Sequence, residues 1–282
     1  MFVIEVCMKL DNFPNWAPSN CFGAIKLVSL AAVLLCSTAG QAVSLTTYRI
    51  YLDDNNRTES FIVFTRGTQP EKCDLDFKHF DFDSVGKMTM NQGTALPANA
   101  ADDWVRYSPR NFVVQPGKPQ TIRFSMRRKP NTEAAEYRSY IAIRCEDVVN
   151  DPVASGKDNV VVKDRVQMNV KPLLVQNVPL IIRTGSLNVS ASISDVVVGG
   201  GKITAKLNRS GPRSIYGRVS LVDKKSDEEY AFTEAVSVYP ETSTYAFEFA
   251  LHADMPPLEQ LKLKFTEDEN YGGDLTIEKS VK

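Results

Sequence analysis

Hydrophobic and polar residues alternate over short runs along most of the chain. The run CDLDFKHFDF at 73–82 places Leu75 on the face opposite Asp76. A period of two is the pattern of a half-buried β-strand. The alternation breaks at Phe80, which predicts a bend or bulge at that residue. After residue 42, no segment keeps the helical period over three turns.

Runs rich in β-branched and aromatic residues follow one another, with Asn, Asp, Gly and Pro between them. In the first half they lie at 44–52, 59–66, 73–82, 104–114, 118–127 and 137–145. In the second half they lie at 186–198, 201–210, 216–224, 229–239, 244–253 and 258–268. Short strands at this spacing predict an all-β protein with two Ig-like β-sandwich domains, one over 43–175 and one over 176–282.

Another alternating segment, VQMNVKPLLVQNV at 166–178, crosses the predicted boundary between the two domains. Its apolar positions share one parity, and they are Val166, Met168, Val170, Leu174 and Val178. Pro172 has the same parity, and because it lacks an N–H it limits pairing on one side or ends the segment. Such a strand either fills the core of its own domain or pairs with another protein, and periodicity alone leaves both open.

The N-terminus has the pattern of an export signal. Lys26 precedes the apolar run LVSLAAVLLC at 27–36, and small residues then lead to a cleavage site after Ala42. The alternative is a membrane anchor, but the run is short for a bilayer span. The segment before Met8 is long for a signal peptide, so either translation starts at Met8 or the extension is genuine. We expect residues 1–42 to be removed from an exported, not membrane-embedded, protein.

Two cysteines, Cys73 and Cys145, remain after residue 42. Because an export compartment is oxidising, they predict one disulfide, with two free thiols as the alternative. The chain has no Cys-x-x-Cys motif and no Cys/His cluster, so no metal site is predicted.

Signatures of catalysis and of nucleic-acid binding are scarce. The two histidines, His79 and His252, lie in different halves and have no neighbour that would make either a base or a ligand. A carboxylate pair assembled by folding, as a glycosidase needs, stays open. The net charge of −1 removes the usual electrostatic argument for nucleic acid as a partner. We therefore expect a binding protein, with no enzymatic activity and no cofactor.

Several segments, in order, resemble periplasmic pilus chaperones of the chaperone–usher pathway. AVSLTTYRIYLDDNNRTESFIVF at 42–64 resembles the first hairpin of that family, and YSPRNFVVQPGKPQTIRF at 107–124 is similar to its Pro- and Gly-containing segment. EYRSYIAIRC at 136–145 resembles the strand that follows. VQMNVKPLLVQNVPLIIRTGSL at 166–187 resembles the archaic branch, whose members often read IPVIVRHG where this chain has VPLIIRTG. The resemblance covers the first domain and the start of the second.

The resemblance implies two Ig-like domains in an L or boomerang arrangement with a cleft between them, in a chaperone of the periplasm. Such chaperones bind and stabilise pilin or fimbrial subunits and deliver them to an outer-membrane usher. A pilin is an Ig-like domain without its last strand, and the chaperone lends a strand to complete it. The segment 166–178 is then the donor strand. Pilin subunits and the usher are the expected partners, and self-association of the free chaperone would hide the apolar stripe.

The family also holds the C-terminal carboxylate of the pilin with two basic residues in the cleft. Arg49, in the first predicted strand, has the position that the family gives to an arginine. A guanidinium suits the task because its fork matches a carboxylate. The second basic residue of the family is a lysine, but Pro179 or a neighbour stands there in this chain. Arg183 is the nearest basic candidate and Lys171 is the alternative.

In an Ig-like sheet the strands at 73–82 and 137–145 would be antiparallel neighbours. Cys73 begins one and Cys145 ends the other, so a disulfide between them is geometrically reasonable. It would close a loop of about 70 residues, which is worth about 4 kcal/mol in the loop-entropy model.

Two other functions compete with the chaperone. A secreted Ig-like adhesin or pilus structural subunit would be a single incomplete domain with its own N-terminal donor extension, which the continuous first strand bearing Arg49 argues against. A carbohydrate-active enzyme on a β-sandwich would lose its activity with one Asp or Glu and would be indifferent to Arg49.

Overall fold

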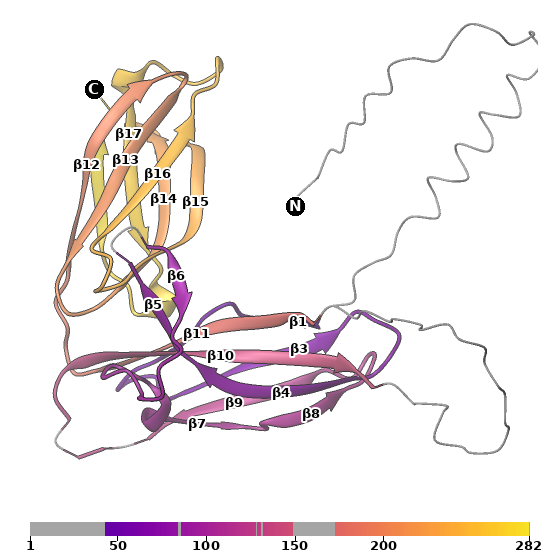
Figure 1. The fold of residues 1–282 in the computed structure, drawn as a ribbon. Coiled ribbons are helices and arrows are strands. Elements are labelled where there is room, and N and C mark those ends of the chain that lie inside the picture. The colour runs from indigo at the N-terminus through magenta and orange to yellow at the C-terminus, as the bar shows by residue number, and fades with distance from the viewer. Residues whose placement is uncertain (1–42, 84–85, 128, 131, 149–172, 282) are drawn as a thin grey trace, which may run out of the picture. The chain divides into compact units, whose positions relative to one another are not determined.

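The computed structural model describes residues 43–83, 86–127, 129–130, 132–148 and 173–281. Strands make up the regular structure of these residues, apart from three short 3₁₀ turns at Asp102–Trp104, Leu258–Gln260 and Glu269–Tyr271 (Figure 1). Within the same residues, no helix is long and apolar enough to span a bilayer. The all-β prediction is confirmed.

The first sandwich has two sheets that face each other across a common core. One sheet has the order β1–β3–β9–β7, made of Val43–Leu45, Thr58–Thr65, Gln120–Met126 and Val105–Ser108. The other has the order β2–β11–β10–β4–β8, made of Ile50–Leu52, Val175–Thr184, Ala135–Asp147, Glu71–Lys78 and Asn111–Val114. Its core includes Leu52, Phe61, Phe124, Ile141 and Ile182. A separate hairpin joins β5 (Phe80–Phe82) to β6 (Met88–Met90).

The second sandwich is built in the same way from the rest of the chain. One sheet has the order β12–β13–β16, made of Ser190–Gly199, Lys202–Ser210 and Thr244–Ala250. The other has the order β15–β14–β17–β18, made of Glu229–Val238, Ile215–Asp223, Leu261–Glu267 and Thr276–Ser280. Its separate core includes Ile203, Leu207, Leu221, Leu263 and Phe265. Two sheets around each of two cores make the two β-sandwiches that the sequence predicts.

The strand predicted at 44–52 is in fact two strands in opposite sheets. β1 pairs with β3, whereas β2 runs parallel to β11. Leu45 and Ile50 have opposite parity, so one straight strand would point them to opposite faces. The break between β1 and β2 lets both side chains enter the core, where each is buried. Arg49 lies at the end of this break, immediately before β2.

The strand β11 lies beyond the boundary predicted at residue 175. It pairs with β10 from Val175 to Thr184 and sends Val178 and Leu180 into the core of the first sandwich. The first sandwich therefore continues through Thr184, and the sheets of the second begin at Ser190.

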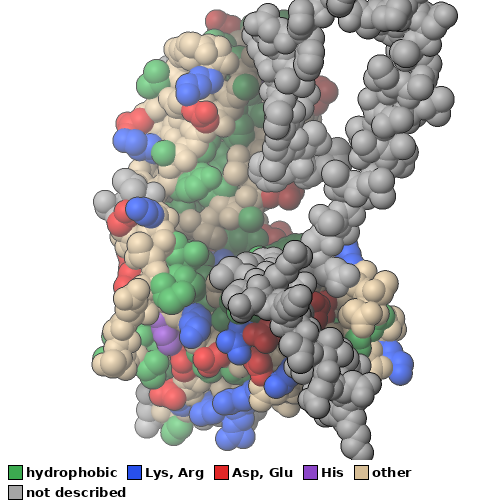
Figure 2. All heavy atoms as spheres, turned by 45° about the vertical axis from the view of Figure 1, so that its right-hand side comes forward, with side chains coloured by type: hydrophobic (Ala, Val, Ile, Leu, Met, Phe, Trp, Pro, Cys, Tyr) green, Lys and Arg blue, Asp and Glu red, His purple; other side chains and the backbone are tan. Residues whose placement is uncertain are grey.

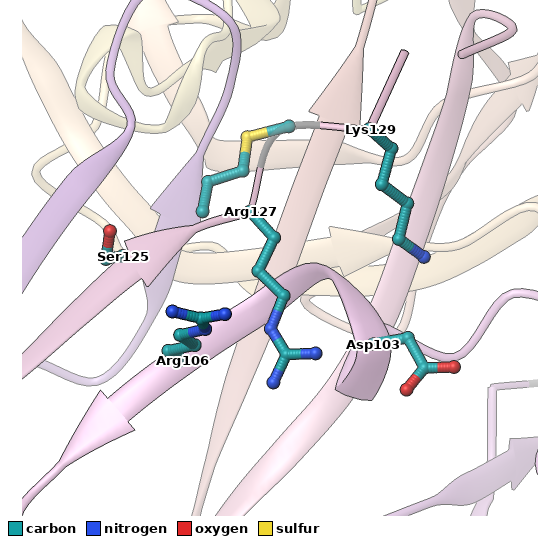
Figure 3. Close-up of a pocket in the computed structure, with 6 residues that line it drawn as sticks. Asp103, Arg106, Ser125, Arg127 and Lys129 are labelled. Carbon is teal, nitrogen blue, oxygen red and sulfur yellow. The ribbon is translucent and has the colours of Figure 1, made fainter. Parts of the chain in front are cut away.

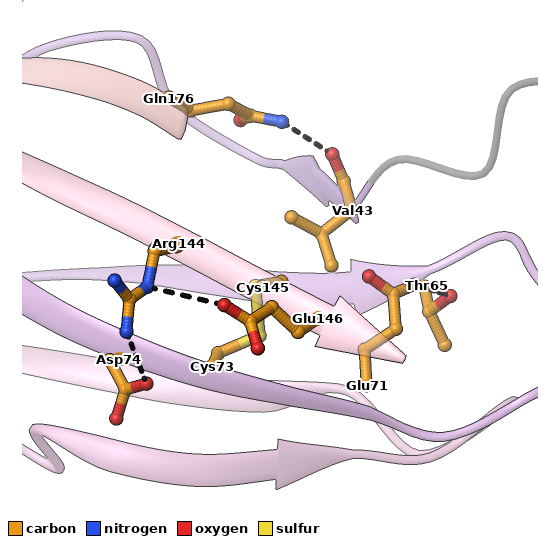
Figure 4. The surroundings of a disulfide bond; sticks show 9 residues. All are labelled: Val43, Thr65, Glu71, Cys73, Asp74, Arg144, Cys145, Glu146 and Gln176. Carbon is orange, nitrogen blue, oxygen red and sulfur yellow. Dashed lines mark hydrogen bonds and ion pairs between the residues drawn. A yellow bond between two sulfur atoms is a disulfide. The ribbon is translucent and has the colours of Figure 1, made fainter. Parts of the chain in front are cut away.

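Two local predictions about β4 are confirmed. β4 ends at Lys78 and β5 begins at Phe80, so the strand breaks where the alternation does. Cys73 and Cys145 lie directly opposite each other on β4 and β10 and form a disulfide, with 4.1 Å between their Cα atoms (Figure 4).

Charged side chains cover the outside of the molecule in a mixed pattern. The sequence has 33 Lys and Arg against 34 Asp and Glu. On the face drawn in Figure 2, acidic and basic side chains are interspersed with hydrophobic ones. A mixed surface of this kind favours solubility, and departures from it point to binding sites.

Candidate functional site

Arg49 is a buried cation whose guanidinium has few partners. The Thr47 hydroxyl donates to the Arg49 carbonyl at 2.8 Å and fixes the backbone locally. The Arg49 side chain extends to the second sandwich, where it donates weakly to Ser237 Oγ at 3.5 Å and lies over the Tyr216 ring, 4.3 Å from its centroid. The residue is only 2% exposed, and its Nε has no hydrogen-bond partner. No described carboxylate forms an ion pair with it.

Two tyrosines lie near Arg49, and its positive charge acts on the pKa of both. Tyr140 on β10 and Tyr239, which follows β15, are hydrogen-bonded through their side chains. Burial raises the pKa of the Tyr140 phenol, with the neighbouring Tyr239 adding to the rise, while the Arg138 and Arg49 cations oppose it. Burial pushes the pKa of the Tyr239 phenol upward as well, but the Arg49 charge and the hydrogen bond to Tyr140 outweigh it and hold this pKa below its ordinary value.

Arg138 lies in the same neighbourhood but already has a carboxylate. Its two terminal nitrogens donate to Glu241 at 3.1 and 2.9 Å, and its guanidinium stacks over the Tyr239 ring, 4.1 Å from the centroid. Burial pushes the pKa of Glu241 upward, but the Arg138 hydrogen bonds and charge outweigh it and hold this pKa below its ordinary value. A cavity of about 100 Å³ opens beside this pair and is lined in part by His79 and Asn99.

Arg183 has the opposite character to Arg49. Its Nε donates to Glu136 at 2.9 Å, and its terminal nitrogens donate to the carbonyls of Gly272 and Ser214, both at 2.9 Å. Glu136 in turn accepts from the Ser214 backbone N–H and hydroxyl. Each charge of this pair is therefore hydrogen-bonded, and the pair ties β11 and β10 to the second sandwich. The Arg183 guanidinium has little capacity left for a further carboxylate.

The N-terminal part of β11 has an open edge. β11 pairs with β10 along its length but with β2 only at Leu180–Ile182. From Val175 to Pro179, no described strand pairs with its second edge. A hollow of about 400 Å³ follows this edge and is lined by Tyr48, which is 79% exposed, and by residues of β1, β3 and β11. An unpaired edge beside a partly apolar hollow is a surface to which another strand can add.

Apolar side chains become exposed where β11 begins. Leu173, Leu174 and Val175 are 48%, 57% and 40% exposed. Leu174 has the parity of Val178, which is 3% exposed and packs in the core of the first sandwich. The face that fills this core therefore continues outward to an exposed leucine. The arrangement presents at Leu174, not at Val178, an apolar side chain that another protein could cover.

The other predicted members of the site lie outside the described residues. They are Val166, Met168, Val170 and Lys171. Sequence reasoning did not single out Arg138, Tyr239 or Glu241 as members of the site. EYRSY marks Arg138 only through the family resemblance, and no sequence pattern connects it with Glu241, because the two are 103 positions apart.

The chemistry of this region is that of recognition. In the described part of the chain, it offers a buried guanidinium without an ion-pair partner, two phenols hydrogen-bonded to each other and an unpaired strand edge. Among the described residues, no group of three or more His, Cys, Asp or Glu side chains could hold a metal ion.

Comparison with known proteins finds similar solved structures. No family model matches the sequence, and no curated protein does. The YadV chaperone is 9% identical, with a TM-score of 0.44, over 84% of this chain and 98% of its own. The Pseudomonas aeruginosa CupB2 chaperone is 12% identical, with a TM-score of 0.45, over 85% of this chain and 100% of its own.

A third similar structure holds a partner. It is the CsuC–CsuE chaperone–tip adhesion subunit pre-assembly complex from the archaic chaperone-usher Csu pili of Acinetobacter baumannii. The matched chain is 11% identical, with a TM-score of 0.42, over 84% of this chain and 97% of its own. At these identities and TM-scores, what the present chain binds has to be inferred from its own residues.

Proposed function

We propose that the chain is a periplasmic chaperone that binds and stabilises pilus or fimbrial subunits by donor-strand complementation and delivers them to an outer-membrane usher. The observation that carries this proposal is the open edge of β11 from Val175 to Pro179, together with the exposed Leu174 just before it, which continues the parity of the VQMNV stripe. Arg49, which is buried and has no ion-pair partner among the described residues, also supports it.

An incomplete Ig-like domain is the partner that such an edge fits. A sandwich without its last strand has an apolar groove and two unpaired edges. The strand carrying residues 166–174 would supply main-chain hydrogen bonds to those edges and alternate side chains to the groove. In this arrangement Val178 stays in the core of the first sandwich, while Val166, Met168, Val170 and Leu174 enter the subunit. The two cores then become continuous along one strand.

Burial of the donor side chains in the groove of the subunit gives enough free energy for tight binding. Burying a Val, Leu or Met side chain contributes roughly 1.5–3 kcal/mol. Four such side chains give on the order of 6–12 kcal/mol before the costs of ordering and association are subtracted. The net affinity is then strong enough to hold a subunit and moderate enough for another subunit's strand to replace the donor at the usher.

Arg49 would receive the C-terminal carboxylate of the subunit. Among the described residues its guanidinium donates one hydrogen bond, to Ser237 at 3.5 Å, which is weak, so a carboxylate can replace it at little cost. Charge-assisted pairing in a desolvated site is much stronger than that contact. The phenols of Tyr140 and Tyr239 lie within the electrostatic influence of the same cation. Arg183 is the less suitable second anchor, because Glu136 already neutralises it.

The disulfide is consistent with the proposed location. Bonds such as Cys73–Cys145 persist in oxidising compartments, of which the bacterial periplasm is one.

The proposal is tested by co-expression with a pilin-like chain encoded beside its gene, followed by purification through the chaperone. We expect a one-to-one complex with the natural pilin. A pilin whose last residue is followed by a short Gly-Ser extension should be recovered far less, because its carboxylate no longer reaches Arg49. A pilin that carries its own missing strand at its C-terminus should not be recovered at all. Equal recovery of all three forms would refute donor-strand complementation.

A further inference from the structure

A basic pocket lies on the first sandwich and shares no residue with the Arg49 region or the open edge of β11. It encloses about 450 Å³ at the ends of β7 and β9, and Figure 3 shows its side chains. The lining residues are Asp103, Arg106, Ser125, Met126, Arg127 and Lys129. Three cations against one carboxylate depart from the mixed charges of the rest of the surface.

The three cations of this pocket have no carboxylate partner in the described part of the chain. None of Arg106, Arg127 and Lys129 forms an ion pair with any residue of the described parts of the chain. Arg106 and Lys129 are exposed, but Arg127 is half-buried, and buried arginines such as Arg138 and Arg213 do have carboxylate partners. The pocket therefore keeps a local excess of positive charge in a protein whose net charge is −1.

Arg127 gives a second, independent sign of a ligand. Its Nε is buried yet has no hydrogen-bond partner among the described residues. In Figure 3 its guanidinium lies between the side chains of Arg106 and Asp103. A buried donor without an acceptor costs free energy, so an acceptor from outside the chain would be bound favourably. A guanidinium on an ordinary solvated face would leave this atom in water.

Neighbouring residues hold the other groups in place without cancelling their charge. The Lys129 ammonium lies over the Trp104 ring, 4.0 Å from its centroid, and Trp104 stacks on Tyr137. Arg106 on β7 lies directly opposite Ser125 on β9, so the serine hydroxyl and the arginine side chain line the pocket on the same face of the sheet. Aromatic contact orients a cation while leaving its charge available.

We propose that this pocket binds a phosphate group. A phosphate has several acceptor oxygens and, as a monoester, up to two negative charges, which suits two guanidiniums, an ammonium and a hydroxyl better than the single charge of a carboxylate. The group could belong to soluble phosphate or to the headgroup of an anionic lipid, since both present the same oxygens. Arg127 Nε supplies a donor that has no acceptor among the residues the structure describes.

The test follows the NMR signal of the Arg127 Nε–H in the purified protein during titration with inorganic phosphate at constant ionic strength. We expect a saturable shift in the wild type and a weakening of about 30-fold in Arg106→Gln/Lys129→Gln, because each cation contributes about 1 kcal/mol near an anionic group. The matched control, Lys225→Gln/Lys279→Gln, removes two exposed cations of the second sandwich and should leave the titration unchanged. A shift that never saturates, or that is equal in both double variants, would overturn the proposal.

Vesicles distinguish the two sources of phosphate. Sedimentation with phosphatidylcholine vesicles that contain phosphatidylglycerol, but not with phosphatidylcholine alone, would assign the site to lipid, provided that Arg106→Gln/Lys129→Gln abolishes it. Saturable binding of inorganic phosphate without such sedimentation would assign it to a soluble ligand. An aspartate-rich peptide that shifts the Arg127 signal at lower concentration than phosphate would show that the pocket recognises acidic protein segments, and the phosphate assignment would be wrong.

Discussion

Arg49 and Arg183 are two arginines of the first sandwich that reach the second and are buried to a similar degree, at 2% and 6% exposure. Arg183 has a buried carboxylate and two carbonyls as acceptors. Arg49 has one weak contact with a serine hydroxyl and an Nε with no acceptor among the described residues. Arg183 is therefore fully hydrogen-bonded, whereas Arg49 has no anionic partner in the described part of the chain.

The difference separates two uses of the same side chain. A buried ion pair whose members are fully hydrogen-bonded holds a fixed geometry. A buried cation without an anion is costly to the folded protein and is expected where a ligand supplies the missing charge. The two residues should therefore respond in opposite ways to substitution.

The largest expected effect is on stability. Arg183→Met should reduce the free energy of unfolding by about 3–5 kcal/mol, because it leaves Glu136 as an unpaired buried charge. Arg49→Met should change it by less than about 1 kcal/mol, or raise it, because no ion pair is lost. Urea unfolding at neutral pH measures both. If both variants lost a similar free energy of unfolding, Arg49 and Arg183 would not differ in their role in stability.

The sequence predicted the β-sandwich architecture better than it predicted the difference between Arg183, which is paired, and Arg49, which is paired with no described carboxylate. Alternation located most strands and the break at Phe80, because burial of one face enforces a period of two. It missed the division of 44–52 into β1 and β2, since strand propensity does not show when a chain changes sheets. The final strand β18 (Thr276–Ser280) was also missed. The disulfide was predictable because only two cysteines remain after residue 42.

The partners of the arginines could not be read from the sequence. Arg183 and Glu136 are 47 positions apart, and Ser214 joins them from another domain. Arg183 and Glu136 lie opposite each other in the register of β11 and β10, whereas the contact with Ser214 depends on how the two sandwiches meet, which no local pattern records. The parity of Leu174 was readable, but its exposure was not, because alternation does not show where the core of the sandwich ends.

The second expected effect is on subunit binding. Arg49→Met should weaken binding of a pilin with a free C-terminal carboxylate by about 2–4 kcal/mol, a loss of 30-fold or more in affinity, because a desolvated charge pair is removed. Arg49→Lys should restore part of it, since the charge returns without the fork. Titration calorimetry or competition against a labelled pilin measures the affinities. Binding of a pilin lacking that carboxylate should hardly change in either variant, which is the control.

A smaller effect is expected at the start of β11, where two adjacent leucines form a matched pair. Leu174→Asp should weaken pilin binding by about 1.5–3 kcal/mol, because its side chain continues the apolar stripe. Leu173→Asp introduces the same charge at a similar exposure but on the opposite face, so its effect should be several-fold smaller. Both variants should unfold at the wild-type urea midpoint. If Leu173→Asp were as damaging as Leu174→Asp, the strand would not be inserted with the proposed face inward.

The smallest effect concerns the third arginine, Arg138, whose carboxylate partner is only partly buried. The pKa of Glu241 is held below its ordinary value of 4.5, so its contribution to stability is present above that pH and is lost as the pH falls through the lowered pKa. Because the Glu241 side chain is 36% exposed, solvent screening keeps this contribution below about 1 kcal/mol. Urea unfolding of the wild type and Glu241→Gln should therefore differ at pH 7 and converge in acid. A difference that grew on acidification would mean that Glu241 is not the group that Arg138 stabilises.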